Sequence, residues 1–334
     1  MLSVDGIENN STYEIYSKSL INPDLLQKIS YLSKNSILAS IGNTPLIQIN
    51  IKDINVPNGV KIFAKIESQN PGGSIKDRAA WSIIREGIFS GKIFNKKGFF
   101  RPIVDASSGN TAIGYSLVAS TLGIKLRLFI PKNASKERLK ILKAYGAEVF
   151  TTDPLEGIDG AIEEVKNFIE MNPDYYYLDQ YNNDANLKAH YYSTGREILE
   201  QTNNEITHFV SCLGTSGTFM GTGKRLRKNL GNKVQLIAVQ PDSPFHGIEG
   251  AKHMGSSIIP GIYDNSFPDK FEFVSTSEAE KFTKILAKNG IFVGTSSGAA
   301  LFSSVKVARN MKFGNVVTIF PDGGERYLST NLWE

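Results

Sequence analysis

A lysine in an unusual position is the first residue of this chain that could do chemistry. Lys76 lies in the stretch Glu67–Arg78 (ESQNPGGSIKDR), between a short apolar segment at 62–66 and a predicted helix. Asn70–Gly73 form a turn between them, because proline fixes φ and glycine adopts φ values that other residues avoid. Ser74 stands where a helix N-cap is expected, so Lys76 falls in the first turn, where the macrodipole disfavours a cation. A lysine whose pKa is lowered can form a Schiff base, because the free amine is the nucleophile. A solvent-exposed lysine at the start of a surface helix is the alternative.

A second stretch has the composition of a phosphate-binding loop. It follows a predicted strand at 206–213 and precedes a predicted helix at 217–230. Its glycines let backbone N–H groups converge, its hydroxyls add donors, and the helix N-terminus adds positive potential. The glycine spacing fits neither a Walker A loop nor a dinucleotide fingerprint. A tight turn that needs small residues is the alternative. The residues are Gly214, Thr215, Ser216, Gly217 and Thr218.

Three further turns follow predicted strands. The turn at 107–111 (SSGNT) offers hydroxyls and N–H groups at a helix start, which suit a carboxylate, although Ser and Asn are also common N-caps. The turn at 294–300 contains Ser296, and the turn at 321–327 (PDGGERY) ends the last predicted strand. Ligands of open α/β sheets gather at the carboxyl ends of strands, which is where all these turns lie.

Composition limits the class of protein. Of 334 residues, 41% are hydrophobic and 21% charged, which is ordinary for a globular protein. The net charge of +4 is mild and scattered, so nucleic-acid binding is not expected. No apolar run approaches the roughly 18 residues of a membrane span, and the first 40 residues lack the apolar segment of a signal peptide. The single cysteine, Cys212, allows no intrachain disulfide and no cysteine cluster for a metal, so we expect a cytoplasmic protein without a metal site.

The elements that must position these turns alternate along the chain, which predicts an α/β fold with parallel sheets and helices on both faces. The predicted strands are 45–49, 62–66, 102–106, 125–131, 147–152, 175–181, 206–213, 234–240, 271–276 and 315–320. The predicted helices are 78–87, 111–122, 135–145, 159–171, 185–202, 217–230, 277–289 and 299–309.

Seven segments, taken together and in order, resemble the fold-type II pyridoxal-phosphate enzymes, within them the cysteine synthase/cystathionine β-synthase group. The segments are 41–46 (IGNTPL), 70–78 (NPGGSIKDR), 107–111 (SSGNT), 179–181 (DQY), 214–218 (GTSGT), 294–298 (GTSSG) and 324–330 (GERYLST). They extend over nearly the whole chain after residue 40. The resemblance implies a two-lobed, three-layer αβα fold like that of the tryptophan synthase β subunit. It implies an N-terminal arm at 1–40, a smaller mobile domain at 70–183, and a larger domain made of 41–69 with 184–334.

The resemblance also implies a role for each site residue, with pyridoxal 5′-phosphate as cofactor. Lys76 would form the Schiff base and move the α-proton, and residues 214–218 would hold the cofactor phosphate. Asn110 would bind the phenolate oxygen of the cofactor ring, and Ser296 its pyridine nitrogen. The substrate carboxylate would be bound by Ser107, Ser108, Thr111 and Gln180.

The implied reaction is β-replacement on O-acetyl-L-serine or O-phospho-L-serine by sulfide or a sulfide donor, via an α-aminoacrylate, giving L-cysteine. The segment at 250–264 resembles that of the phosphoserine-using subgroup, in which a basic residue stands near Lys252. A dianionic phosphate leaving group would need such a cation, which Lys252 or His253 could supply. An ordinary charged surface loop is the alternative.

Other functions remain open at this point. They are a heme-free cystathionine β-synthase, a diaminopropionate-type synthase, a serine/threonine dehydratase and a non-catalytic binding protein. A heme-dependent synthase is excluded on ligand grounds, because no cysteine precedes Cys212 and no histidine precedes His190. We expect a homodimer in which the arm lies on the partner subunit, and a smaller domain that closes on the substrate and excludes water.

Overall fold

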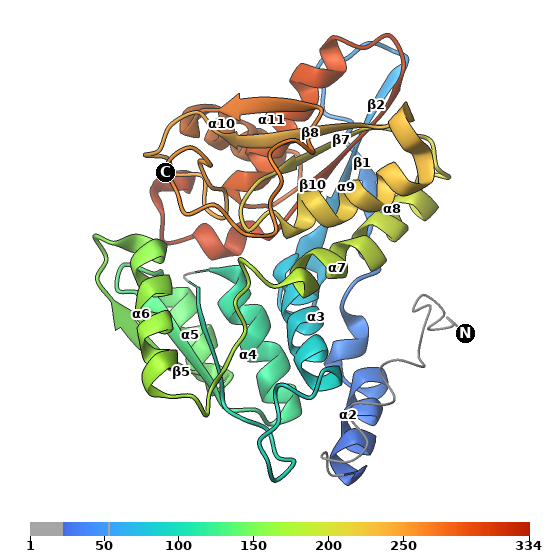
Figure 1. Cartoon of the computed structure of the whole chain (residues 1–334). Helices are drawn as coiled ribbons and strands as arrows, with labels where there is room; N and C mark the ends of the chain where they lie inside the picture. Colours follow the sequence, from blue (N-terminus) through green and yellow to red (C-terminus); the bar gives the residue numbers. More distant parts are fainter. Residues whose placement is uncertain (1–22, 53, 108) are drawn as a thin grey trace. The chain divides into compact units, whose positions relative to one another are not determined.

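The computed structural model describes residues 23–52, 54–107 and 109–334, which form two compact units (Figure 1). The first unit contains the described residues up to Ile41 and those of Ala80–Gln180. The second contains Gly42–Ala79 and Tyr181–Glu334. Helix α3 (Lys76–Phe89) begins in the second unit and continues in the first.

The observed units differ from the expected domain bounds at the turn that precedes α3. Residues 70–79 belong to the second unit, although they were expected in the smaller domain. Two contacts within the second unit account for this. The backbone N–H of Ile75 donates to the carbonyl oxygen of Pro321 at 2.8 Å, and Ser74 forms an antiparallel bridge with Asp322.

The second unit is built on a six-stranded sheet with the order β1-β2-β10-β7-β8-β9. Strand β1 runs antiparallel to β2, and every other neighbouring pair is parallel. The strands are β1 (Leu46–Gln48), β2 (Val60–Ile66), β7 (Ile206–Cys212), β8 (Gln235–Pro241), β9 (Lys270–Val274) and β10 (Gly314–Phe320).

Helices cover both faces of this sheet. Helix α11 packs on one face with α10 against it, while α8 and α9 lie on the other face and α7 packs on α9 (Figure 1). The helices are α7 (Asp184–Tyr192), α8 (Thr194–Gln201), α9 (Gly217–Leu230), α10 (Thr276–Lys288) and α11 (Thr295–Arg309). Short 3₁₀ helices occur at Glu67–Gln69, Gly231–Lys233, Gly324–Tyr327 and Asn331–Trp333.

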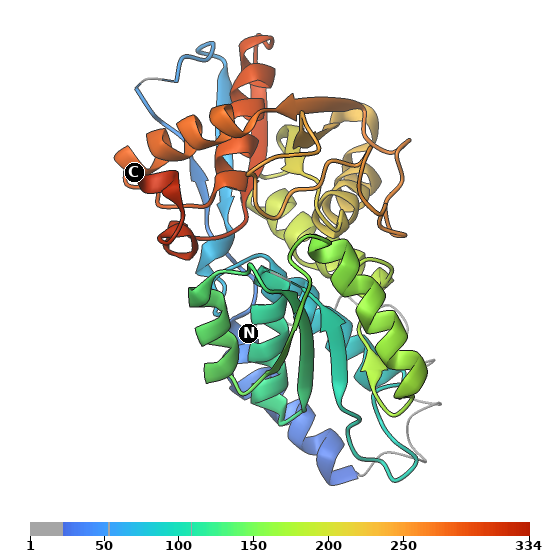
Figure 2. The same cartoon turned by 90° about the vertical axis from the view of Figure 1, so that its left-hand side faces the viewer.

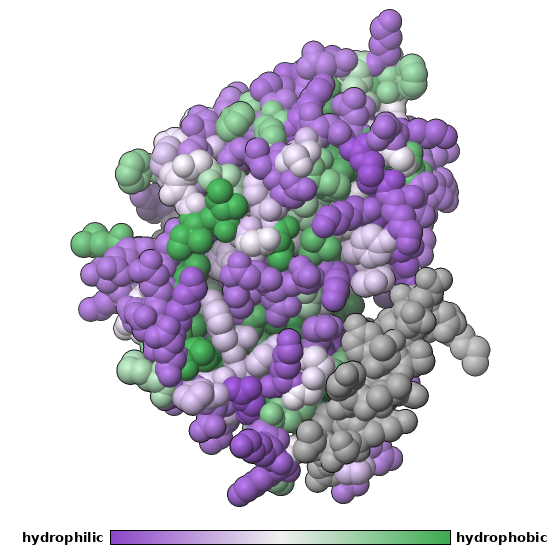
Figure 3. All heavy atoms as spheres, viewed as in Figure 1, coloured by the Kyte–Doolittle hydropathy of each residue, from purple (hydrophilic) through white to green (hydrophobic). Residues whose placement is uncertain are grey.

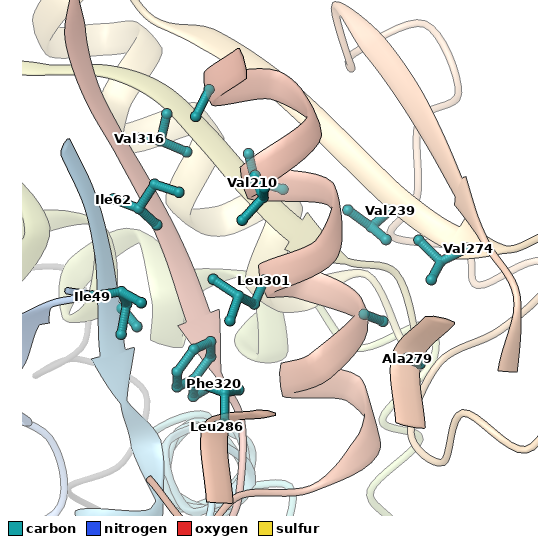
Figure 4. Close-up of a cluster of buried hydrophobic side chains, with 14 of the residues drawn as sticks. Ile49, Ile62, Val210, Val239, Val274, Ala279, Leu286, Leu301, Val316 and Phe320 are labelled. Atoms are coloured by element: carbon teal, nitrogen blue, oxygen red, sulfur yellow. The ribbon is translucent and has the colours of Figure 1, made fainter. Parts of the chain in front are cut away.

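Successive residues of the central strands pack alternately into two separate hydrophobic cores. Val316 of β10 packs in the cluster that contains Leu301 of α11 (Figure 4), whereas its neighbour Val317 packs in the cluster that contains Phe219 of α9. Strand residues point alternately to opposite faces, so a strand covered on both sides must be apolar throughout. This explains why β10 is apolar at successive positions, Val316 and Val317, that point to opposite faces.

The first unit has a four-stranded parallel sheet with the order β5-β4-β3-β6. Helices α4 and α5 pack on one side of it and α6 on the other (Figure 2). The strands are β3 (Ile103–Ala106), β4 (Leu126–Pro131), β5 (Glu148–Thr152) and β6 (Tyr176–Tyr177). The helices are α2 (Pro23–Asn35), α4 (Asn110–Leu122), α5 (Lys136–Ala144) and α6 (Gly157–Met171), with a 3₁₀ turn at Ile37–Ser40.

The predicted α/β fold with parallel-rich sheets is confirmed, and two of its local differences from the prediction concern a helix and a strand near the site. The helix predicted at 185–202 is two helices that meet at Ser193, whose hydroxyl donates to the carbonyl oxygen of Ala189 at 2.6 Å. The strand predicted at 175–181 has only two residues, because the chain turns at Asp179, where φ is +49°. Both differences lie beside residues of the site described below.

Hydrophilic residues cover most of the face shown in Figure 3, and apolar residues appear there in small groups. Among the described residues, no helix is both long enough and apolar enough to span a membrane.

Candidate active site

The turn before α3 is held by hydrogen bonds that place Lys76 at the helix start. The N–H of Gly73 donates to the carbonyl oxygen of Asn70 at 2.7 Å, and the N–H of Gly72 donates to the carboxylate of Asp77 at 2.5 Å. The hydroxyl of Ser74 accepts from the N–H of Lys76 at 3.2 Å. Helix α3 begins at Lys76, so the lysine lies in its first turn as predicted.

The amine of Lys76 faces the loop at 214–218. Its Nζ donates to the hydroxyl of Thr215 over 3.4 Å. Burial lowers the pKa of Lys76 from 10.5 to about 8, and the opposing charge of Asp322 does not restore it. The amine is therefore much closer to its nucleophilic, neutral form at physiological pH than an ordinary lysine is.

The backbone of the loop at 214–218 forms a cradle that larger residues would fill. A Cβ at Gly214 would lie 2.3 Å from the carbonyl oxygen of Gly250, and one at Gly217 would lie 2.1 Å from Oδ1 of Asn186. Ser216 has a φ of +71°, which turns the chain just before α9 begins at Gly217. Within the described part of the chain, the buried hydroxyl of Ser216 has no hydrogen-bond partner. A buried donor without a partner at a helix N-terminus fits a phosphate group, so this loop can hold the phosphate of pyridoxal phosphate.

Helix α7 supports this loop with two buried polar side chains. Nδ2 of Asn186 donates to the hydroxyl of Thr215 at 3.0 Å, and Nε2 of His190 lies 3.3 Å from the hydroxyl of Thr218. Neither residue was expected at the site. The signal in the sequence is their spacing of four residues, which places both side chains on one face of a helix.

The turn that contains Ser296 is joined to the end of β10. The backbone N–H of Gly294 donates to the carbonyl oxygen of Asp322 at 3.3 Å, and the hydroxyl of Tyr327 donates to the Asp322 carboxylate at 2.7 Å. A Cβ at Gly294 would lie 2.4 Å from that carboxylate. Ser296 is buried in the first turn of α11, and its carbonyl oxygen accepts from the thiol of Cys212 at 3.4 Å. Asp322 thus connects the Lys76 and Ser296 turns, a role that the sequence did not indicate although the turn at 321–327 was singled out.

A buried network of charges anchors the first turn of α3. Arg78 donates to the carboxylate of Glu197 at 2.6 and 2.8 Å and to that of Glu67 at 2.7 and 2.9 Å. Nζ of Lys65 lies 2.8 Å from Glu197. Burial acts to raise the pKa of Glu197, but the hydrogen bonds and charge of Arg78 and the charge of Lys65 outweigh it, and the pKa is lowered to about 2. Such a network holds Arg78, and with it the helix turn that carries the lysine, in one geometry.

The first unit brings together three of the residues expected to bind the substrate carboxylate. The hydroxyl of Thr111 donates to Oε1 of Gln180 at 2.8 Å, and Nε2 of Gln180 donates to the carbonyl oxygen of Ala106 at 2.9 Å. The hydroxyl of Ser107 accepts from the N–H of Ala112 at 3.2 Å. Asn110 is the first residue of α4. Ser108, the fourth residue expected to bind the carboxylate, lies outside the described residues.

Lys252 lies beside the loop at 214–218 within the second unit. Its backbone N–H donates to the carbonyl oxygen of Leu213 at 2.8 Å, directly before Gly214. Its side chain is buried, with Nζ 5.0 Å from the centre of the Tyr181 ring and 3.3 Å from the carbonyl oxygen of Ile258. It is therefore no ordinary surface lysine.

Known proteins are similar to this chain in sequence and in fold. The chain matches the family described as "Pyridoxal-phosphate dependent enzyme" over residues 37–322. A cysteine synthase of Aquifex aeolicus is 50% identical over 308 residues, which cover 90% of this chain and 93% of the relative. The crystal structure of a cysteine synthase from Entamoeba histolytica is similar with a TM-score of 0.83 at 35% identity, covering 90% of each chain. That of an O-acetylserine dependent cystathionine beta-synthase from Helicobacter pylori is similar with a TM-score of 0.83 at 37% identity, covering 90% of this chain and 99% of the other.

The fold and the site thus define a pyridoxal-phosphate dependent enzyme. The chain belongs to the fold-type II family of these enzymes, in its cysteine synthase group, which confirms the resemblance drawn from the seven sequence segments.

Proposed function

We propose that this enzyme forms L-cysteine by β-replacement on an activated L-serine, with sulfide or a sulfide donor as nucleophile. The observation that carries the proposal is the amine of Lys76, whose pKa burial lowers to about 8 and which lies 3.4 Å from the hydroxyl of Thr215 in the phosphate-binding loop. The cofactor, when bound, supplies an electron sink for the substrate. Lys76 would bind the cofactor and then move the proton of the substrate α-carbon.

The remaining roles divide between cofactor and substrate. Gly214–Thr218 would hold the cofactor phosphate, Asn110 the phenolate oxygen and Ser296 the pyridine nitrogen. A neutral hydroxyl does not force protonation of that nitrogen as a carboxylate would, which favours replacement at the β-carbon over transamination. The substrate carboxylate would be bound by Ser107, Ser108, Thr111 and Gln180.

We propose O-phospho-L-serine as the first substrate, because the segment at 250–264 resembles that of the phosphoserine-using subgroup and the basic side chain of Lys252 within it is buried against Tyr181. A leaving phosphate dianion gains a charge-assisted hydrogen bond from such a residue. O-acetyl-L-serine is the second candidate, favoured by the Helicobacter pylori relative whose name specifies O-acetylserine. That name also makes a cystathionine-forming reaction an alternative outcome.

The absorbance of the purified enzyme tests the reaction class. We expect a visible band from the bound cofactor that is absent in Lys76→Ala and that changes when activated serine is added. Cysteine should then appear when sulfide is added. If no visible band forms with cofactor supplied, the enzymatic proposal is wrong and the chain is a binding protein with an enzyme's fold.

Two variants of Lys252 test the substrate. With phosphoserine, Lys252→Met should lose about tenfold or more in kcat/KM, because a charge-assisted contact is removed, while Lys252→Arg should retain most activity. Neither change should affect turnover of acetylserine. Spectral change and turnover with acetylserine alone would instead make acetylserine the substrate. The expected homodimer would have about twice the chain mass of 36.8 kDa, which light scattering measures.

A further inference from the structure

Both ring nitrogens of His190 lie close to threonine hydroxyls. His190 is fully buried on α7. Its Nδ1 lies 3.0 Å from Oγ1 of Thr194, the first residue of α8, and its Nε2 lies 3.3 Å from Oγ1 of Thr218, the last residue of the phosphate-binding loop. Thr194 follows His190 by four residues, a spacing that places the two side chains next to each other.

The ring is neutral. Burial lowers the pKa of His190 well below its usual value, and the positive charges of Arg78 and Lys76 lower it further, whereas Glu197 acts in the opposite direction. A neutral imidazole has one N–H donor and one acceptor nitrogen, so the two threonines must meet it with opposite roles.

An anion bound in the loop would favour one of the two neutral tautomers of His190, which carry the proton on Nδ1 or on Nε2. Thr218 has a single hydroxyl proton. If it donated that proton to Nε2, it would present only oxygen lone pairs to an anion, which is repulsive. If Nε2–H donates to Thr218 instead, the hydroxyl proton is left for the anion, and Thr194 can donate its own proton to Nδ1.

The other threonine of the loop is held with the same polarity. Oγ1 of Thr215 accepts from Nδ2 of Asn186 at 3.0 Å and from Nζ of Lys76 at 3.4 Å. Asn186 precedes His190 by one helical turn. Helix α7 therefore donates to Thr215, and a donating His190 would treat Thr218 in the same way.

We propose that Thr194, His190 and Thr218 form a directed hydrogen-bond relay, in which His190 carries its proton on Nε2 and orients the Thr218 hydroxyl proton toward the phosphate group of the cofactor. His190 and Thr194 are positioning residues in this relay. The inference rests on the proposed role of residues 214–218 as the phosphate site.

The tautomer of His190 is directly measurable. The chain has four histidines, so the ring signals of the nitrogen-15-labelled, cofactor-loaded enzyme can be resolved by NMR, and that of His190 is the one missing in His190→Gln. We expect protonated Nε2 and unprotonated Nδ1 at neutral pH. A proton on Nδ1, or on both nitrogens, overturns the relay.

Binding of pyridoxal phosphate, compared with pyridoxal, tests what the relay does. Both ligands are titrated into the full chain freed of cofactor, and the ratio of their affinities isolates the phosphate contribution. His190→Asn keeps a polar group near the Nδ1 position but loses Nε2, and the ratio should fall about tenfold or more. His190→Gln places an N–H donor near Nε2 and should retain most of the ratio. Thr194→Val removes the hydroxyl and should lower the affinity ratio, whereas Thr194→Ser keeps the hydroxyl and should retain the wild-type ratio.

The outcomes separate this inference from the proposed function. If the wild-type chain does not prefer pyridoxal phosphate over pyridoxal, the loop is not a phosphate site, and both proposals fail. If it does, but His190→Asn leaves the ratio unchanged or weakens both ligands equally, the relay alone is wrong and His190 has a packing role.

Discussion

Titration of Lys76 directly tests whether burial lowers the pKa of its amine. Burial lowers its pKa from 10.5 to about 8 in the folded chain. A difference of this size corresponds to roughly 3 kcal/mol of preference for the neutral amine. At pH 8 about half of the Lys76 side chains would be free amines, against roughly one in 300 for an ordinary lysine.

Pulse acetylation of the chain freed of cofactor measures this difference. A short pulse of acetic anhydride, applied at a series of pH values, labels each lysine in proportion to its free amine, and peptide mass spectrometry reports Lys76 separately. We expect the labelling of Lys76 to reach half its maximum near pH 8. Exposed lysines of the same sample are the internal reference. A midpoint near the ordinary value of 10.5 would refute the assigned environment of the amine.

The variant Asp322→Asn tests the electrostatic contribution to the pKa of Lys76. Asp322 acts to raise the pKa of Lys76, so removing its charge should shift the midpoint to a lower pH. Asparagine can still accept from the hydroxyl of Tyr327, which keeps the turn in place. A midpoint that stays or rises would contradict this electrostatic account.

The direction of the Lys76 pKa shift also predicts how the free energy of unfolding depends on pH. The folded pKa of Lys76 is below its unfolded value, so the buried charge costs roughly 3 kcal/mol below pH 8, and this cost disappears as the pH rises to 10.5. Lys76→Met should therefore be more stable than the wild-type chain at neutral pH, as measured by urea unfolding without cofactor.

Three further predictions concern the supports of the site. Gly217→Ala should weaken pyridoxal phosphate binding strongly, since its Cβ would lie 2.1 Å from Asn186, and unchanged affinity in a titration would contradict the cradle. Glu197→Gln should lower the free energy of unfolding by about 3–5 kcal/mol at neutral pH, because Lys65 loses its buried ion pair and Arg78 keeps only the one with Glu67. The wild-type advantage should disappear as the pH falls from 4.5 toward 2, the range between the unfolded and folded pKa of the Glu197 carboxyl. Asp105 of β3 is buried, and its carboxylate accepts from the backbone N–H of Gln180 at 3.3 Å. Burial raises the pKa of Asp105 from 3.8 to about 7, so the folded state binds its proton more tightly and loses stability as the pH rises through this range. In Asp105→Asn, urea unfolding should show a smaller loss.

The sequence was sufficient for the features that depend on local chemistry. Alternating apolar and helical segments predicted the α/β fold, because strands buried on both faces must be apolar throughout. The glycine and hydroxyl turns after strands predicted the backbone cradle at 214–218, because only small residues let backbone N–H groups converge. Lys76 was found for the same reason, since turn residues and a cap mark the start of its helix.

The tertiary structure alone decided the surroundings of these residues. Asp322, which faces the charge of Lys76, and His190, which supports Thr218, are distant from these partners in the sequence. The spacing of four between Asn186 and His190 indicates a shared helix face, but not which loop that face meets. The network between Arg78 and Glu197 likewise joins segments that only the packed sheet and helices bring together. Turn and helix preferences are properties of neighbouring residues, whereas a pKa or the tautomer of a ring depends on burial and on charges that arrive from elsewhere in the chain.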